Sequence, residues 1–280
     1  MKPDDGATVP ADRAIALDAH PSRALSRLGA GVRTVGALAG LAASAFLALA
    51  LASLLALLIV RVGADWFDGL AIPNGDRPRF YPRKLAMREL ALDVIRQILL
   101  AFLVIGAVRW RDRLRWRETL AVAPAGDAGA VGLSWRRFAL ILLVWPLVHI
   151  TWVTGSAELL HMPINRHTSL SPTLSPPAAL AWFAYVLVLA PVAEELLMRG
   201  AVFARARQLL SPARTIVVTG LFFALAHLTP AGFARPLSLI PLALVLGWVR
   251  WRSGRLWPCI LLHAWSNLAM VTYVLWPSGG

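Results

Sequence analysis

The chain has 280 residues, of which 58% are hydrophobic and 15% are charged, and its formal net charge is +13. Soluble domains carry about a quarter charged residues, so this composition excludes an ordinary soluble domain and favours a membrane protein. The arginines lie beside apolar segments, which argues against a nucleic-acid partner and for contact with the headgroups of the lipid bilayer.

Apolar segments recur along the chain, and about 20 such residues are needed to cross a bilayer core. We therefore predict an all-α fold, a polytopic transmembrane bundle of about seven helices, with six or eight as alternatives. The expected helices are Thr34–Val60, Leu90–Val108, Phe138–Gly155, Ala178–Ala204, Thr215–Leu228, Leu237–Val249 and Leu256–Trp276. The fifth and sixth are short for a complete crossing.

Three domains are expected. Residues 1–33 mix Asp, Arg, Pro and Ala without a clear period, which predicts a mobile cytoplasmic tail. Residues 34–170 are expected to form N-terminal membrane helices, and residues 171–280 a helical core that contains the polar residues considered below.

Arginine placement predicts the orientation of the bundle. Arginines cluster in Arg109–Arg117, Arg205–Arg214 and Arg250–Arg255, each between two apolar segments. The positive-inside rule places such loops in the cytoplasm. We therefore expect a multi-pass protein of the bacterial inner (cell) membrane with a cytoplasmic N-terminus. The Arg61–Glu89 loop would then face outward although it also carries Lys and Arg.

The fourth segment contains two adjacent glutamates, Glu194 and Glu195, followed by Arg199. Residues four apart share a face of a helix, so Glu195 and Arg199 can form an ion pair that supports the structure. Glu194 points about 100° away from that face. Charges inside a membrane helix are rare and mark functional sites, so Glu194 is the first candidate catalytic residue. Pro191, one turn earlier, removes a backbone hydrogen bond and can kink the helix.

Polar residues also occur in the fifth and seventh segments. The sequence FALAH places Phe223 and His227 four apart, and HAWSN does the same for His263 and Asn267. Each motif alone could be a packed histidine or a hydrogen-bonded pair between helices. Their depths favour a site, because a rise of 1.5 Å per residue puts Glu194, His227 and His263 about 12 to 20 Å from the arginine-rich helix ends. Polar groups at one depth can converge on one pocket.

The motifs EELLMR, FALAH and HAWSN, in this order and spacing, resemble the CPBP family of CAAX-processing and bacteriocin-processing intramembrane proteases. This family, also called Abi, is related to the type II CAAX prenyl endopeptidase. The resemblance covers about a third of the chain, from Ala178 to Tyr273. It implies that residues 171–280 are a catalytic core, and that the chain is an endopeptidase acting on a membrane-proximal or lipid-anchored peptide.

Peptide hydrolysis needs an activated water and a stabilised oxyanion. An apolar pocket makes a carboxylate a stronger base, so Glu194, with the help of His227, would take a proton from water. His263 and Asn267 would donate hydrogen bonds to the oxyanion. Glu195, Arg199 and Phe223 would support these residues. The same assignment follows from the resemblance.

Other chemistries remain open. Two histidines and a glutamate can bind zinc with an open fourth position, although the chain has no HExxH motif. We predict no cofactor firmly, and zinc stays an alternative. Buried Glu and His also occur in transporters and proton relays, and a non-catalytic scaffold or immunity protein could keep the same fold.

Overall fold

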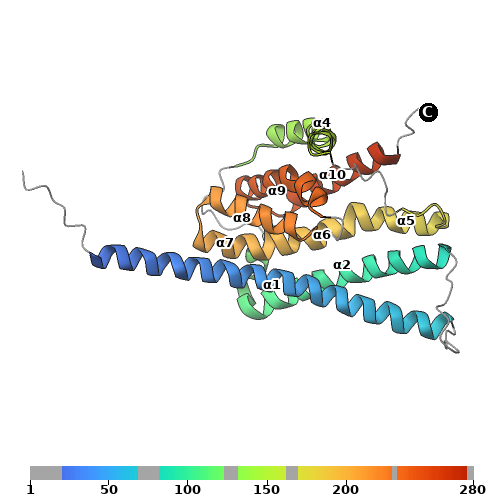
Figure 1. The fold of residues 1–280 in the computed structure, drawn as a ribbon, viewed down its shortest axis with the longest axis horizontal. Helices are drawn as coiled ribbons and strands as arrows, with labels where there is room; N and C mark the ends of the chain where they lie inside the picture. Colours follow the sequence, from blue (N-terminus) through green and yellow to red (C-terminus); the bar gives the residue numbers. More distant parts are fainter. Residues whose placement is uncertain (1–20, 69–81, 123–131, 162–169, 229–231, 276–280) are drawn as a thin grey trace, which may run out of the picture. The chain divides into compact units, whose positions relative to one another are not determined.

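The computed structural model describes residues 21–68, 82–122, 132–161, 170–228 and 232–275 (Figure 1). Within these ranges the chain forms helices and no strands, so the predicted all-α class is confirmed. The chain divides into two compact units, Met1–Gly40 and Leu41–Gly280. The described part of the first unit is the beginning of helix α1, and the second unit contains the remaining helices.

Helices form at all seven segments that their apolar character predicted. They are α1 (Pro21–Asp68), α2 (Pro82–Asp112), α4 (Trp135–Leu159), the interrupted helix α5–α7 (Pro176–Leu209), α8 (Pro212–Leu225), α9 (Ala234–Ser253) and α10 (Trp257–Leu275). Two short helices, η1 (Arg113–Arg115) and α3 (Trp116–Thr119), follow α2. Most helices extend past the predicted ends, because arginine and other flanking residues continue a helix well.

Proline explains several helix starts. The helices α1, α2, α5 and α8 each begin at a proline, which suits the first turn because its missing N–H has no partner there. The expected tail, residues 1–33, is therefore already helical from Pro21 onward, and its first 20 residues lie outside the described ranges.

Five helical stretches of the described chain are long and apolar enough to cross a membrane: Gly31–Gly63, Arg83–Thr119, Trp135–Leu159, Pro176–Leu209 and Trp257–Leu275. The apolar helix α8 is shorter, with 14 residues, as its apolar segment predicted. The helix α9 reaches 20 residues only by including Arg235, Arg250 and Arg252. These lengths and compositions are those of a multi-pass integral membrane protein.

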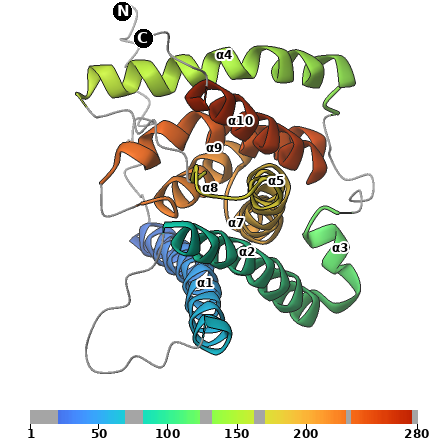
Figure 2. The same ribbon diagram turned by 90° about the vertical axis from the view of Figure 1, so that its right-hand side faces the viewer.

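The interrupted helix α5–α7 lies at the centre of the second unit (Figures 1 and 2). Helix α2 packs against its middle on one side, while α8, α9 and α10 pack against it on the other. Helix α4 packs on the outer side of α9 and α10. The central helix therefore meets every neighbour that contributes a polar residue to the site.

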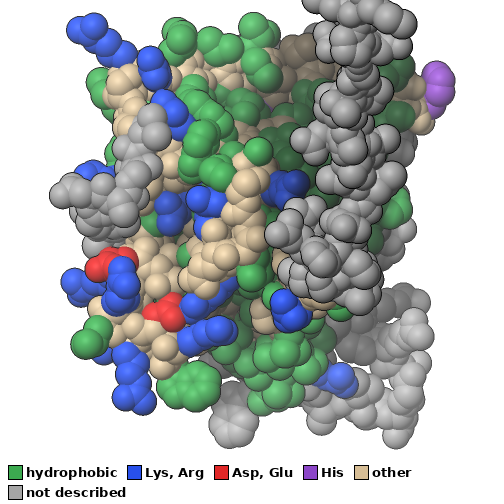
Figure 3. Space-filling model, turned by 90° about the vertical axis from the view of Figure 1, so that its left-hand side faces the viewer, with side chains coloured by type: hydrophobic (Ala, Val, Ile, Leu, Met, Phe, Trp, Pro, Cys, Tyr) green, Lys and Arg blue, Asp and Glu red, His purple; other side chains and the backbone are tan. Residues whose placement is uncertain are grey.

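The arginine-rich loops meet at one end of this unit. Arg205 forms an ion pair with Asp112, which joins α7 to the end of α2. The backbone N–H of Leu256 donates to the carbonyl of Ala121 over 3.0 Å, which joins the start of α10 to the segment after α3. Figure 3 shows Lys and Arg side chains gathered on one face of the molecule, with few Asp and Glu. The three loops that the positive-inside rule grouped therefore share one end of the bundle.

A close contact at Gly200 holds this end against the central helix. A Cβ atom at Gly200 would lie 2.9 Å from Leu120 Cδ2 and 3.6 Å from the Leu120 backbone. Leu120 is fully buried, so it has little room to move. Only glycine lets the chain after α3 approach the central helix this closely.

Replacing Gly200 by valine is expected to lower the free energy of unfolding by about 1–3 kcal/mol, because the added methyl groups overpack a buried contact. The double variant with Leu120→Ala should be less destabilised than the sum of the single variants by about 0.5–3 kcal/mol, since the two residues touch. The measurement is the unfolding midpoint in detergent. Gly106→Ala is the control, because no neighbouring atom lies within 4 Å of its Cβ position. Strict additivity would contradict the contact.

Candidate active site

Two π-helical segments interrupt the central helix and flank the glutamates. They are η2 (Tyr185–Leu189) and η3 (Leu196–Val202), and α6 (Ala190–Glu195) lies between them. The N–H of Ala190 donates to the carbonyl of Tyr185, five residues earlier, as a π turn requires. Segments of this kind occur frequently at functional sites. Pro191 follows the first of these segments. Because it has no backbone N–H to donate, the regular α-helical hydrogen bonding is broken there, and the helix widens into a π turn.

Glu195 and Arg199 form a fully buried ion pair, with Arg199 Nη1 3.0 Å from Glu195 Oε1. Arg199 Nη2 also donates to the carbonyl of Ala243 in α9 over 2.9 Å. Its guanidinium carbon lies 4.5 Å from the centre of the Phe223 ring in α8, a cation–π distance. The four-residue spacing does bring the charges together, and the arginine connects the central helix to two neighbours.

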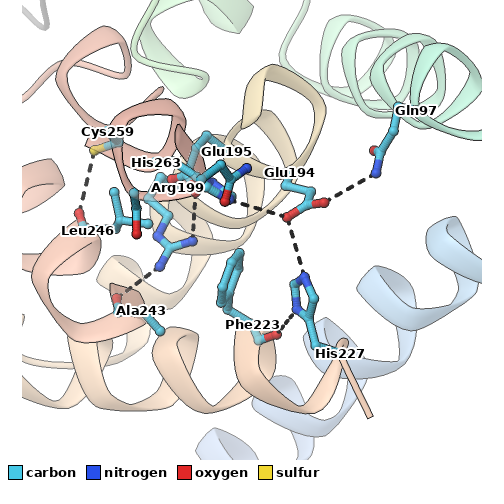
Figure 4. A network of polar contacts seen from close by, with 12 residues as sticks. Gln97, Glu194, Glu195, Arg199, Phe223, His227, Ala243, Leu246, Cys259 and His263 are labelled. Atoms are coloured by element: carbon cyan, nitrogen blue, oxygen red, sulfur yellow. Dashed lines mark hydrogen bonds and ion pairs between the residues drawn. The ribbon is translucent and has the colours of Figure 1, made fainter. Parts of the chain in front are cut away.

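Glu194 faces a different group of residues (Figure 4). Its Oε1 atom accepts a hydrogen bond from Gln97 Nε2 of α2 over 3.2 Å. Its Oε2 atom lies 3.6 Å from His227 Nε2 and 3.9 Å from His263 Nε2. Both separations exceed an ordinary hydrogen bond, for which a bridging water is the usual alternative. The structure thus brings Glu194 and both predicted histidines together from three parts of the chain.

Exposure separates the two glutamates. The side chain of Glu194 keeps 18% of its surface accessible and that of His227 keeps 22%, whereas Glu195 has none. A reacting group must be reachable by its substrate. Glu194 and His227 therefore meet this condition, and Glu195 does not.

The other ring nitrogen of each histidine has its own partner. His227 Nδ1 lies 2.9 Å from the carbonyl oxygen of Phe223, and His263 Nδ1 lies 2.9 Å from Glu195 Oε1. Both partners are acceptors, so each Nδ1 carries a hydrogen and donates it. The Phe223 ring also contacts both imidazoles, with centroid distances of 4.8 Å to His227 and 5.7 Å to His263. These contacts fix the rings with Nε2 directed at Glu194.

Asn267 lies one turn beyond His263 on α10, and its amide nitrogen donates to the carbonyl of Val186 in η2 over 2.9 Å. Val186 precedes Pro191 by five residues. In a π-helical register its carbonyl would need the N–H that proline lacks. The structure therefore gives Asn267 a hydrogen-bond partner in the central helix, in addition to the oxyanion role that the sequence suggested for it.

Sequence reasoning missed the contribution of α2. Gln97 contacts Glu194. Asp93 lies four residues before Gln97 and forms an ion pair of 2.8 Å with Arg96, the residue next to Gln97. Asp93 and Gln97, four residues apart, share one helix face. The signal was present in the sequence. The charged residues Asp93 and Arg96 and the glutamine lie inside the predicted Leu90–Val108 span, where such polar residues are as unusual as Glu194.

No group of three or more His, Cys, Asp or Glu side chains in the described ranges is arranged to hold a metal ion.

The fold and this cluster define a polytopic helical membrane protein with a buried glutamate–histidine site. A comparison with protein families then matches residues 176–269 to the family described as "Type II CAAX prenyl endopeptidase Rce1-like", which covers a third of the chain and all three motifs. The family resemblance inferred from the motifs is thereby confirmed. Comparisons with curated proteins and with solved structures gave no match. The family match points to a CAAX-type intramembrane protease, a hydrolase with a peptide or protein substrate in a lipid environment.

Arg199→Met is expected to lower the free energy of unfolding by about 3–5 kcal/mol, because it leaves a buried carboxylate without its cation. The double variant Glu195→Gln/Arg199→Met should recover part of this loss, since both charges are then gone. The measurement is the unfolding midpoint in detergent. Arg136→Met, at an exposed position, is the control. A single variant as stable as this control would contradict the role of the ion pair.

Proposed function

We propose that the protein is an integral membrane endopeptidase that hydrolyses a peptide bond of a membrane-proximal or lipid-anchored substrate. The observation that carries this proposal is Glu194 Oε2 directed at the Nε2 atoms of His227 and His263 within 4 Å. The carboxylate has one oxygen held by Gln97 and the other available for chemistry.

Glu194 acts as the general base. A water molecule between Glu194 Oε2 and His227 Nε2 can donate one hydrogen to each, because Nδ1 of His227 already carries the ring's hydrogen. Its oxygen lone pairs then face away from both groups, toward the scissile carbonyl. General bases contribute about 10²–10⁴-fold to the rate of such reactions.

His263 and Asn267 stabilise the oxyanion. His263 donates from Nδ1 to Glu195, so it becomes a donor at Nε2 only when the ring carries both hydrogens. Asn267 has two amide hydrogens and gives one to Val186, which leaves the second for the oxyanion.

The reaction then proceeds in two steps. The water oxygen bonds to the carbonyl carbon while Glu194 takes one water proton, and His263 and Asn267 bind the oxyanion. When the tetrahedral intermediate collapses, the C–N bond breaks and Glu194 returns the proton to the leaving amine. Glu195, Arg199 and Phe223 take no part in bond changes and keep the histidines in place.

The arginine-rich end of the bundle is proposed to face the cytoplasm, with the N-terminus on the same side, in a bacterial inner membrane. The clustering of three basic loops at one end supports this orientation. The family match does not favour the transporter or the non-catalytic alternative.

Glu194→Gln is expected to lower kcat by about 10²–10⁴-fold, because an amide cannot accept the water proton. His227→Ala should lower kcat in the same assay. The measurement is cleavage of a fluorescence-quenched peptide with a lipidated cysteine near its C-terminus, with the enzyme in proteoliposomes. The control is Glu118→Gln, which changes an exposed carboxylate paired with Arg115. Cleavage that survives Glu194→Gln would refute the proposal. A loss of wild-type activity in chelator, restored by zinc, would favour metal catalysis instead.

Asn267→Ala is expected to lower kcat by about 10²–10³-fold, the typical effect of losing one oxyanion donor. Pro191→Ala separates this role from the contact with Val186, since alanine supplies the missing backbone N–H. If Asn267 served only the Val186 carbonyl, the double variant would regain activity. We expect no such rescue when kcat is measured for both single variants and the double variant.

A further inference from the structure

The site extends beyond the family-matched segment through one buried amide. Gln97 of α2 is 4% exposed and donates from Nε2 to Glu194 Oε1 over 3.2 Å. A buried amide without a hydrogen bond is costly in an apolar environment, so the glutamine is held there by a partner. It lies about 80 residues before the matched range begins at residue 176.

Packing determines where Gln97 points. Leu100, Val104 and Val108 follow it at helical spacing, and all three are buried. They belong to the same apolar cluster as Ala193 and other residues of the central helix. Because this stripe fixes the rotation of α2 against α6, the side chain of Gln97 is directed at Glu194 rather than at lipid.

The chemistry of an amide nitrogen explains what the contact does. It can only donate, so it favours the ionised carboxylate, and a hydrogen bond to a charged group is among the stronger ones. It also occupies Oε1, which leaves Oε2 to face His227 and His263. We propose that Gln97 is a positioning residue that holds the carboxylate of Glu194 ionised and correctly rotated for proton abstraction. This inference depends on the proposed function.

Other charged groups surround Glu194 from each neighbouring element. His227 approaches from the segment after α8, His263 from α10, and Glu195 is adjacent in α6. On the α2 side, Asp93 and Arg96 form an ion pair of 2.8 Å, and Tyr185 of η2 interacts with both. The Asp93–Arg96 pair carries no net charge. Among the groups on the α2 side, the amide of Gln97 is therefore the one whose removal would act directly on Glu194.

The test uses the full-length protein in proteoliposomes and the pH dependence of kcat. Gln97→Met keeps the side-chain volume and removes the donor, while Gln97→Glu replaces the donor by a second carboxylate. Without the donor, Glu194 should hold its proton more tightly, so the acidic limb of the profile should move to higher pH. We expect a 10- to 100-fold lower kcat at neutral pH, of about the size that losing a hydrogen bond to a charged group causes. KM should change little.

The shift should be larger for Gln97→Glu, because two neighbouring carboxylates cannot both ionise easily, and it should be about one pH unit or more. The control is Ile98→Leu, at the adjacent and partly lipid-exposed position of the same helix. Unfolding midpoints are measured for every variant. If the glutamate variant fails to fold, the methionine variant alone decides.

Two outcomes would overturn the inference while leaving the proposed function intact. One is a Gln97→Met profile that superimposes on the wild type. The other is a lower kcat with an unmoved acidic limb and a lowered unfolding midpoint, which would indicate only a structural role. Retained cleavage by Glu194→Gln would instead refute the proposed function itself, so the two failures are distinguishable.

Discussion

The ion pair of Glu195 and Arg199 is the interaction on which the site depends, since an uncompensated charge at the centre of a membrane helix costs about 2.5–3.5 kcal/mol. The pair is fully buried, and the arginine also contacts the Phe223 ring and a carbonyl of α9. His263 donates to the same carboxylate. Because Glu195 already has these two partners, the neighbouring Glu194 is the carboxylate left to face His227.

The first interruption of the central helix, η2, follows from one residue. Pro191 cannot donate a backbone hydrogen bond, and the π turn of η2 lies directly before it. The carbonyl of Val186 then needs a donor from elsewhere, which Asn267 supplies. The defect that the proline introduces is thus compensated by a side chain of another helix, and this bond ties α10 to the central helix at the level of the site.

The sequence predicted the helices and the meeting of Glu194, His227 and His263, because apolar length and depth along a helix depend on local spacing alone. It did not predict Gln97, although a glutamine in an apolar span is visible to the same argument. Packing between helices far apart in sequence decides which face of α2 meets α6. The depth of a residue along its helix says nothing about how that helix is rotated about its own axis. The partner of Asn267 was missed for the same reason, since it requires the π turn to be known.

The residues of the HAWSN motif form contacts on two sides of α10, which the packing of the helices makes visible. His263 and Asn267 face the central helix, as described above, while the two residues between them that carry polar atoms face α4. Trp265 Nε1 donates to the carbonyl of Leu142 over 2.7 Å. Ser266 Oγ accepts from Trp145 Nε1 at 3.0 Å and lies 2.7 Å from His149 Nδ1. Neighbouring residues of a helix point in different directions. The motif therefore ties α10 to the central helix on one side and to α4 on the other. The rotation of His263 toward Glu194 therefore depends on α4, a helix that contributes no residue to the site itself.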